Sequence, residues 1–287
     1  TYEHVTLTFG PVDRVATLTV KAPSTVVDLP ATPSDLGDTW WPLKAMRELD
    51  DALLHLRFNH LGTGLVLIKT EGDAANVRAT DAQLLAHRDD WYVREVTLHM
   101  KRTLKRLDLT AKTLFALVEE GSCFVGSMYE LALAADRQYM FEEDGVTVGL
   151  TGMNFGPLPM SNGLTRLQTR FLGAPDHPAK LADEQGEDLD ADDAMDLGLV
   201  TDAFDDIDWE DEIRLVVEER ASMSPDALTG MEANLRFAGP ETMETKIFGR
   251  LTAWQNWIFQ RPNAVGPKGA LTLYGRPETA EYDFDRT

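Results

Sequence analysis

The chain has 287 residues, of which 43% are hydrophobic and 26% charged, and its 48 acidic and 27 basic side chains give a formal net charge of −21. A chain of this length buries most of its surface in one or two domains, which excludes disorder for the bulk of the sequence. Nucleic acid and anionic membranes are excluded as partners because both bind clustered Lys and Arg. Every apolar run is far shorter than the ~20 residues of a membrane-spanning helix. The single cysteine, Cys123, excludes an internal disulfide, and these features together predict a cytoplasmic protein.

One block of the chain carries much of the acidic excess. From residue 183 to residue 212, 15 of 30 side chains are Asp or Glu and none is Lys or Arg. A calcium loop that started at Asp188 would need Gly and Glu at its sixth and twelfth positions, where the chain has Asp193 and Leu199. The six histidines include no pair at metal-ligand spacing beside a carboxylate. We therefore predict a solvated, charge-rich connection and no metal site.

The first half of the chain predicts alternating strands and helices. Alternating apolar residues at 5–9 and 15–20, joined by turn residues, predict an antiparallel hairpin. After a long Pro- and Asp-rich connection, Pro42 begins a helix that buries one face. Residues 65–68 are a continuous apolar run, typical of a strand buried on both faces of a parallel sheet. A long helix and another strand are predicted after it, over about 82–107 and 113–118.

The alternation continues beyond the middle of the chain. A helix rich in small residues is predicted over 128–135, and two short strands over 138–142 and 146–150. Short helices are then predicted from Gly163 to Phe171 and around 190–197. These elements predict an α/β core over residues 1–207.

The remaining residues, 208–287, predict a helical region and a tail. A helix that opens at Pro240 has five apolar residues at helical spacing, which we expect to face inward: Met243, Ile247, Leu251, Trp254 and Ile258. Three further aromatic residues widen its apolar surface: Phe248, Trp257 and Phe259. Because Trp is enriched in well-packed interfaces, we expect this helix to lie in a subunit or domain interface.

Few motifs in the chain point to chemistry. A nucleotide-binding loop is absent, because Gly62-Thr63-Gly64 precedes a strand instead of following one, and no serine lies in a Gly-x-Ser-x-Gly turn. The strongest candidate is the segment 120–136, where a strand ends in a glycine-containing turn and leads into a helix. The free N–H groups at the start of such a helix can bind an oxyanion. A glycine turn between strand and helix also occurs in most α/β folds.

This segment resembles the crotonase (enoyl-CoA hydratase/isomerase) superfamily, whose members have a glycine turn followed by a Glu-Leu-Ala-Leu-Ala-x-Asp helix, as in residues 126–136. The resemblance covers residues 1 to about 235. It implies an α/β, crotonase-like (ClpP/crotonase) ββα-type spiral core with a helical C-terminal extension, a CoA thioester substrate and no other cofactor. Further motifs match in the family's order: the strand 15–23, the strand 65–69, Asn154-Phe155-Gly156-Pro157-Leu158-Pro159, Gly163-Leu164-Thr165-Arg166-Leu167, and Ala194 with Gly198-Leu199-Val200.

The departures from the family pattern bear on function. The family's first oxyanion loop matches residues 76–81, where Arg78 lies near the position whose N–H should face the thioester oxygen. In the second loop Ser127 replaces the middle glycine. Of the two carboxylates that the hydratases use as an acid–base pair, the first matches Glu130 and the second falls on Gly152, which has no ionisable group. The resemblance therefore implies degenerate oxyanion positions at Arg78 and Ser127, and leaves Glu130 as the one catalytic candidate.

Residues 263–275 and the acidic, aromatic tail resemble the C-terminus of the benzoyl-CoA-dihydrodiol lyase family, double-length crotonase relatives that open a dihydrodiol ring without oxygen. In that family the N-terminal half is the better-matched crotonase domain, and the resemblance implies that it holds the CoA ester and the catalytic carboxylates. This chain resembles the other half. Because it starts at Thr1 without Met, inside a strand pattern, we expect the reading frame to continue upstream into a catalytic crotonase domain.

The resemblance implies that the chain is the scaffold and dimerisation half of a carbon–carbon lyase that converts the 2,3-dihydrodiol of benzoyl-CoA into an open-chain dehydroadipyl-CoA. Its partners would be its own N-terminal crotonase domain and a second copy, bound through the C-terminal helix. This half alone would be inactive. We expect Glu130 to be dispensable, with Glu130→Gln costing only ~0.3–1 kcal/mol of stability, as for a Glu at a helix N-terminus.

Two alternatives stay open. The chain could be a stand-alone acyl-CoA hydratase or isomerase that uses Glu130 as its single base and the N–H groups of Ser127 and Arg78 as its oxyanion hole. It could also be a protein that binds CoA esters without turnover.

Overall fold

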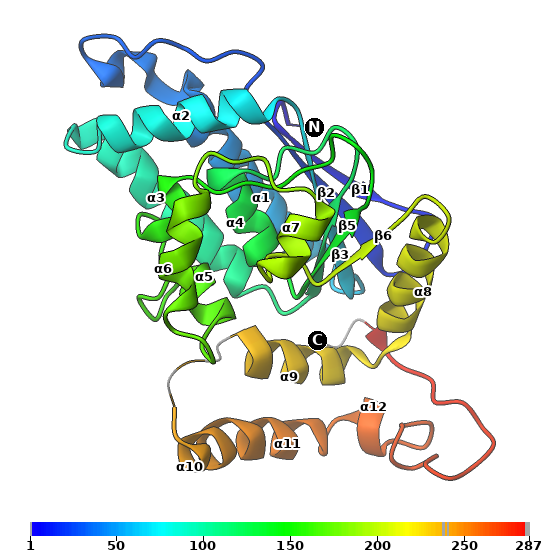
Figure 1. Cartoon of the computed structure of the whole chain (residues 1–287). Coiled ribbons are helices and arrows are strands. Elements are labelled where there is room, and N and C mark those ends of the chain that lie inside the picture. The colour runs from blue at the N-terminus through cyan, green and yellow to red at the C-terminus, as the bar shows by residue number, and fades with distance from the viewer. Residues whose placement is uncertain (1, 237–238, 240, 285–287) are drawn as a thin grey trace.

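The computed structural model describes residues 2–236, 239 and 241–284, so the helix start expected at Pro240 lies outside the described residues. Six strands form one mixed sheet in the order β1-β2-β3-β4-β5-β6, each beside the one that precedes it in the chain (Figure 1). The predicted hairpin is confirmed, since β1 and β2 are antiparallel, and the later neighbours are all parallel. The strands are β1 Val5–Phe9, β2 Val15–Lys21, β3 Leu65–Glu71, β4 Thr113–Val118, β5 Arg137–Phe141 and β6 Asp202–Phe204.

Helices cover both faces of the sheet. The main core joins Leu18 of β2 and Ile68 of β3 to the crossover helices α1, α3 and α4 on one face. A smaller cluster on the other face joins Phe115 of β4 to Val217 and Ala221 of α8. The helices are α1 Trp41–Asn59, α2 Ala74–Ala86, α3 Trp91–Asp108, α4 Gly126–Leu133, α5 Arg166–Arg170, α6 His177–Lys180, α7 Ala191–Asp196, α8 Trp209–Ser222, α9 Pro225–Arg236, α10 Met243–Thr245, α11 Thr252–Ile258 and α12 Pro262–Val265, with the shorter segments η1 Pro33–Thr39, η2 Gly152–Phe155, η3 Leu181–Glu184 and the π-helical η4 Lys246–Leu251.

Two sequence-based expectations about elements are wrong. The helix expected over 82–107 is two helices, because Asp90 caps α3 by accepting hydrogen bonds from the N–H groups of Tyr92 and Val93. The strand expected over 146–150 forms only isolated bridges, in which Val148 pairs with Leu189. The other two bridges join Gly149 to Val125 and Leu150 to Gln185, so the partners of this segment lie outside the named strands.

The C-terminal helices form an arm outside the sheet-and-helix core. Consecutive segments α10, η4 and α11 run alongside α9, and α12 follows them (Figure 1). None of the residues of α10, η4 and α11 is buried, and Met243 and Phe248 are 68% and 75% exposed. The expectation that Met243, Ile247 and Leu251 face inward is therefore wrong for this chain, because the arm packs only part of its surface on α9, where Ile258 lies against Gly230.

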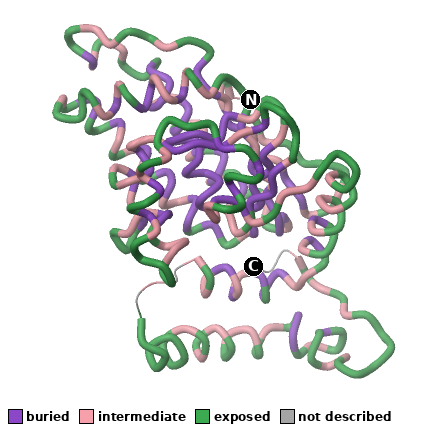
Figure 2. The backbone as a smooth tube through the Cα atoms, viewed as in Figure 1, coloured by how far each residue is buried: buried purple, intermediate pink, exposed green. Residues whose placement is uncertain are grey.

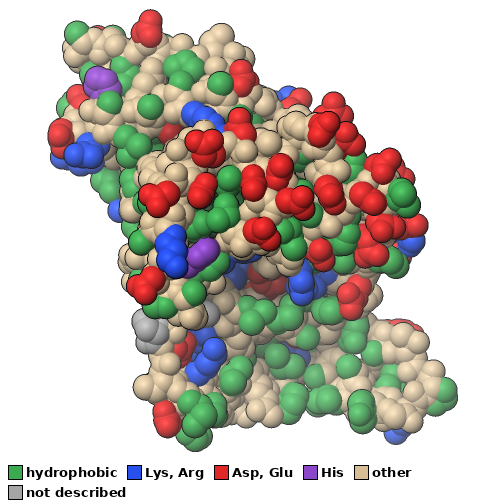
Figure 3. All heavy atoms as spheres, in the orientation of Figure 1, with side chains coloured by type: hydrophobic (Ala, Val, Ile, Leu, Met, Phe, Trp, Pro, Cys, Tyr) green, Lys and Arg blue, Asp and Glu red, His purple; other side chains and the backbone are tan. Residues whose placement is uncertain are grey.

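Acidic and hydrophobic side chains occupy different parts of the face drawn in Figure 3. Asp and Glu side chains gather over α7 and α8, and hydrophobic side chains gather over α9 and α11 (Figure 3). Buried residues concentrate in the sheet and its crossover helices, whereas α10, η4 and α11 are exposed or half-buried (Figure 2). No helix of the described residues is both long and apolar enough to cross a bilayer. Within the same residues, no group of three His, Cys, Asp or Glu side chains is placed to hold a metal ion.

Candidate functional site

The candidate site lies where β4 leads into α4, beside α2. The turn between them contains Gly121, and α4 begins at Gly126, which has φ +48°. A Cβ atom at Gly126 would lie 1.9 Å from Asp81 Oδ2 and 2.5 Å from Thr151 Oγ1. Residue 126 must therefore be glycine both for its backbone conformation and for the close approach of these two side chains.

The first N–H groups of α4 all have partners within the chain. Ser127 N donates to Asp81 Oδ2 at 2.8 Å, and Thr151 Oγ1 donates to the same carboxylate oxygen at 2.7 Å. The N–H of Gly126 donates to the carbonyl of Gly149, and the N–H groups of residues 128 and 129 donate to the carbonyl of residue 125. The N–H group that the sequence assigns to the second oxyanion position thus binds a carboxylate of the protein itself.

Asp81 is fully buried, and burial raises the pKa of its carboxyl to about 6, although the hydrogen bonds from Ser127 and Thr151 act in the opposite direction. At neutral pH the group is therefore largely ionised, and a negative charge sits at the N-terminus of α4, where the helix dipole favours an anion. The sequence indicated Asp81 only as the end of a loop. Its role was missed because its partners lie 46 and 70 residues away.

The first oxyanion position is not a loop. Residues 76–81 lie inside α2, which Asp73 caps by accepting from the N–H of Ala75. Because Arg78 is the fifth residue of α2, its N–H lies beyond the four free donors of a helix start and belongs to the ladder of hydrogen bonds within the helix. The Arg78 side chain turns to the acidic block, where it binds the carbonyl of Glu187 and the carboxylate of Asp188. The expectation that Arg78 N–H faces a thioester is wrong for this reason.

Glu130 is held in a buried ion-pair network. Its Oε2 accepts from Arg166 Nη1 at 2.7 Å and its Oε1 accepts from Asn154 Nδ2 at 2.8 Å. Arg166 also binds Asp108 through two parallel hydrogen bonds, from Nε at 3.0 Å and from Nη2 at 2.7 Å. Glu130, Arg166 and Asp108 are all buried, and burial raises the pKa of the Glu130 carboxyl. Both carboxylate oxygens are therefore committed to partners inside the protein.

The position of the family's second carboxylate is Gly152, which has no ionisable group. Gly152 begins η2, and a Cβ atom there would lie 2.8 Å from Leu85 Cδ1. Asp81, Ser127, Glu130 and Gly152 line none of five cavities found among the described residues. General acid–base catalysis needs an ionisable group within reach of a substrate proton. The site offers neither a paired acid and base nor a free oxyanion donor.

This architecture is the crotonase-like α/β fold of the enoyl-CoA hydratases. The chain superposes on an enoyl-CoA hydratase from Geobacillus kaustophilus with a TM-score of 0.68 over 99% of this chain and 98% of the other, at 16% identity. An enoyl-CoA hydratase from Bacillus anthracis gives the same TM-score over 98% of this chain and 99% of the other, at 15% identity. The fold class predicted from the sequence is confirmed.

A sequence relative points to a more particular protein. The chain is 52% identical over 288 residues to the benzoyl-CoA-dihydrodiol lyase of Aromatoleum evansii. The alignment covers 99% of this chain and 52% of the lyase, so the chain spans about half the length of the curated relative that it matches. No family model matches the chain.

Proposed function

We propose that this chain is the C-terminal, non-catalytic half of a benzoyl-CoA-dihydrodiol lyase, in which it acts as scaffold and dimerisation unit. The whole protein would cleave the ring of the CoA-bound dihydrodiol, a thioester substrate that needs no further cofactor. The relative supports the lyase, and the coverage of about half its length supports the assignment of this chain to one part of it. The resemblance of residues 263–275 to the family's C-terminus favours the C-terminal part.

One observation carries the non-catalytic role: the Asp81 carboxylate occupies the N–H of Ser127, where a thioester oxyanion would bind. An oxyanion hole stabilises negative charge with preorganised donors that are free to receive it. Here an ionised carboxylate already receives the donor, and a second anion beside it would be repelled. The first donor position, at Arg78, is inside α2. The thioester therefore lacks both donors.

The alternative of a stand-alone hydratase or isomerase requires Glu130 as a base. That carboxylate accepts from Arg166 and Asn154, and the surrounding residues leave it 1% exposed. A base must reach the proton that it removes, within about 2.6–3.2 Å or through one water. The geometry therefore favours a structural role for Glu130. A protein that binds CoA esters without turnover meets the same obstacle at Ser127.

The dimerisation role is supported by the exposed apolar residues of the C-terminal arm. Monomeric proteins rarely expose extended apolar patches, and such patches mark interaction sites. We propose that the arm contacts the lyase's own N-terminal crotonase domain or the second copy of the chain. Its exposed apolar side chains are Met243, Ile247, Phe248, Leu251 and Phe259.

The experiment that tests the proposal compares the chain with the complete double-length protein in a ring-cleavage assay on the CoA-bound dihydrodiol. We expect turnover by the double-length protein and none by this chain. Turnover by this chain at a rate within about tenfold of the double-length protein, a difference worth only ~1.4 kcal/mol, would contradict the proposal.

A further inference from the structure

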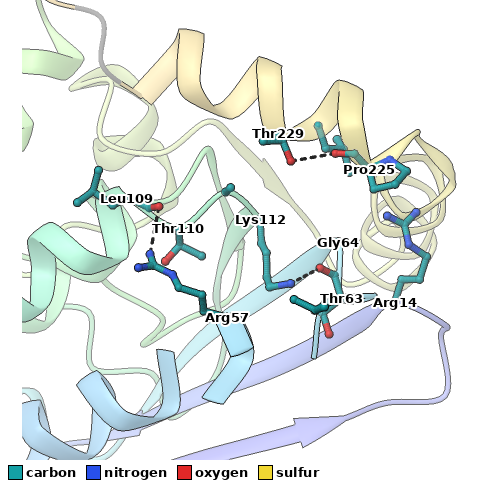
Figure 4. A pocket seen from close by; sticks show the side chains of 12 residues that line it. Arg14, Arg57, Thr63, Gly64, Leu109, Thr110, Lys112, Pro225 and Thr229 are labelled. Atoms are coloured by element: carbon teal, nitrogen blue, oxygen red, sulfur yellow. Dashed lines mark hydrogen bonds between the residues drawn. The ribbon is translucent and has the colours of Figure 1, made fainter. Parts of the chain in front are cut away.

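A cavity lies at the amino-terminal ends of β2, β3 and β4, opposite the strand end from which α4 leads away. It has a volume of about 410 Å³ and opens between these strand ends and α9. Three cationic side chains from different elements line it: Arg57 of α1, Arg14 before β2 and Lys112 before β4 (Figure 4). Its walls are otherwise small or apolar and include Leu61, Leu109, Ala111, Pro225 and Leu228.

The charge of this cavity is unusual for the chain. The formal net charge of the protein is −21, yet no Asp or Glu lines the cavity. Across the described residues, the half-buried Arg14, Arg57 and Lys112 take part in none of the ion pairs, whereas the buried Arg166 pairs with two carboxylates. Buried charges in proteins are normally paired or bound to a ligand.

Backbone carbonyls accept hydrogen bonds from these cations, and the Arg14 guanidinium also lies over the ring of Phe284, 3.9 Å from its centroid, but no carboxylate of the described residues is paired with any of the three. Lys112 Nζ donates to the carbonyls of His60 at 2.9 Å and Thr63 at 2.6 Å. Arg14 Nε donates to the carbonyl of Gly62 at 3.2 Å, and Nη1 donates to that of Met223 at 3.0 Å. Arg14 Nη2 is buried without a hydrogen-bond partner in the described structure. Burial lowers the pKa of Lys112 to about 8, and the nearby charge of Arg14 acts in the same direction.

The backbone is adapted to hold Arg14 in this place. Arg14 has φ +66° and is the one non-glycine residue with positive φ among the described residues. Its guanidinium lies against Gly64, where a Cβ atom would be 2.6 Å from Nη2. A strained backbone position persists when the surrounding structure fixes it, and such positions concentrate at functional sites. This backbone conformation favours Gly or Asn, but the turn has Arg14 there, which places a cation at the cavity.

We propose that this cavity binds a small amphiphilic anion, a carboxylate carried on a compact apolar body. The carboxylate would accept hydrogen bonds from Lys112 and Arg57 and offset the charge of Arg14. The apolar body would lie against Leu109 and Leu228. This cavity lies at the opposite end of the strands from the degenerate crotonase site. The proposal does not depend on the proposed lyase function.

The test is a calorimetric titration of the chain with benzoate and with cyclohexanecarboxylate at low salt. We expect saturable binding at millimolar concentration, weakened about 10- to 100-fold by Lys112→Met, because a hydrogen bond to a charged group contributes that much. Lys112→Arg should weaken binding less than Lys112→Met does, since it keeps the charge but changes the geometry of the donors. The matched control is Lys101→Met on α3, which lies outside the cavity and should leave binding unchanged.

Two further measurements keep the proposal open to refutation if Lys112→Met unfolds the chain. Arg57→Gln removes a half-buried cation with one hydrogen bond, to the carbonyl of Leu109, and should also weaken binding while preserving the circular dichroism spectrum. Benzamide, the neutral counterpart of benzoate, should not bind. Equal binding of benzamide, equal binding of inorganic phosphate, unchanged affinity in Arg57→Gln, or no binding of either carboxylate would each overturn the proposal.

Discussion

Replacing Glu130 by Gln separates a structural carboxylate from a catalytic one. The substitution keeps the size of the side chain and removes its charge. In the structure Glu130 accepts from two donors, Arg166 Nη1 and Asn154 Nδ2. The Asn154 amide cannot turn to compensate, because its Oδ1 accepts from Thr151 N and its Nδ2 also donates to the carbonyl of Gly126. These donors face different carboxylate oxygens, and Gln replaces one of those oxygens by an NH2 donor, so one of the two donors loses its acceptor.

The expected loss of stability follows from the one donor that is left without an acceptor. Leaving one buried donor without an acceptor costs about 1–3 kcal/mol. The cost is partly offset, because Glu130 and Asp108 carry two negative charges against the single positive charge of Arg166, and Gln removes the excess. The ~0.3–1 kcal/mol expected from the sequence for a helix-terminal Glu is therefore too small, since it assumed a solvated side chain. Arg166→Met should cost more, about 3–5 kcal/mol, because it leaves two buried carboxylates without a cation.

The assay measures thermal midpoint and urea unfolding of the chain, together with ring cleavage by the double-length protein that carries the same change. We expect Glu130→Gln to lower the midpoint by roughly 2–4 °C per kcal/mol lost and to leave turnover within about threefold. The control is Glu143→Gln, an exposed carboxylate that should change neither quantity. A fall in turnover of about 10²–10⁴ with an unchanged midpoint would identify Glu130 as a general base and refute the reasoning.

Three further changes test other parts of the structure. In the wild type, burial raises the pKa of Asp81 to about 6, so the free energy of unfolding should fall by up to ~3 kcal/mol as pH rises from about 4 to about 6. Asp81→Asn should lose that pH dependence in urea unfolding measured at several pH values. A pH dependence equal to that of the wild type would exclude Asp81 as its source. Gly126→Ala should lower the free energy of unfolding by more than about 2 kcal/mol, because the backbone strain and the overlap with Asp81 add together. Gly145→Ala, at a positive φ but in open space, should lower it by only about 1 kcal/mol. Equal losses would contradict the role of Asp81. Phe248→Ser should leave the midpoint of the isolated chain unchanged, because the side chain is exposed, and should weaken assembly of the double-length protein in analytical ultracentrifugation; unchanged assembly would remove the arm from the interface.

The sequence predicted the fold well because the fold depends on local patterns. The alternation of β1 and β2 predicted their hairpin, the apolar run at residues 65–68 predicted the parallel strand β3, and the order of motifs predicted the crotonase-like arrangement. The single long helix expected over 82–107 failed because the Asp90 cap interrupts an apolar periodicity that continues on both sides of it. The inward face expected for the C-terminal helix failed because periodicity identifies an apolar face but not what covers it.

The site was predicted as a set of positions but not as a set of contacts. The motifs that contain Asn154 and Arg166 were found in the sequence, yet nothing local indicated that both bind Glu130. Asp81 was overlooked for the same reason, since its partners are Ser127 and Thr151 on distant segments. Long-range pairing of buried polar groups depends on the packing of helices against the sheet, which short-range patterns do not encode.

The measurement that tests the central claim most directly is calorimetry of this chain with benzoyl-CoA and with CoA, using the double-length protein as the positive control. Because Asp81 occupies the Ser127 N–H and the first oxyanion position lies within α2, the account predicts no saturable binding of either compound to the chain, and binding of benzoyl-CoA to the control. Saturable binding of benzoyl-CoA to the chain that persists in Lys112→Met, and so does not arise at the cavity beside α9, would contradict the account.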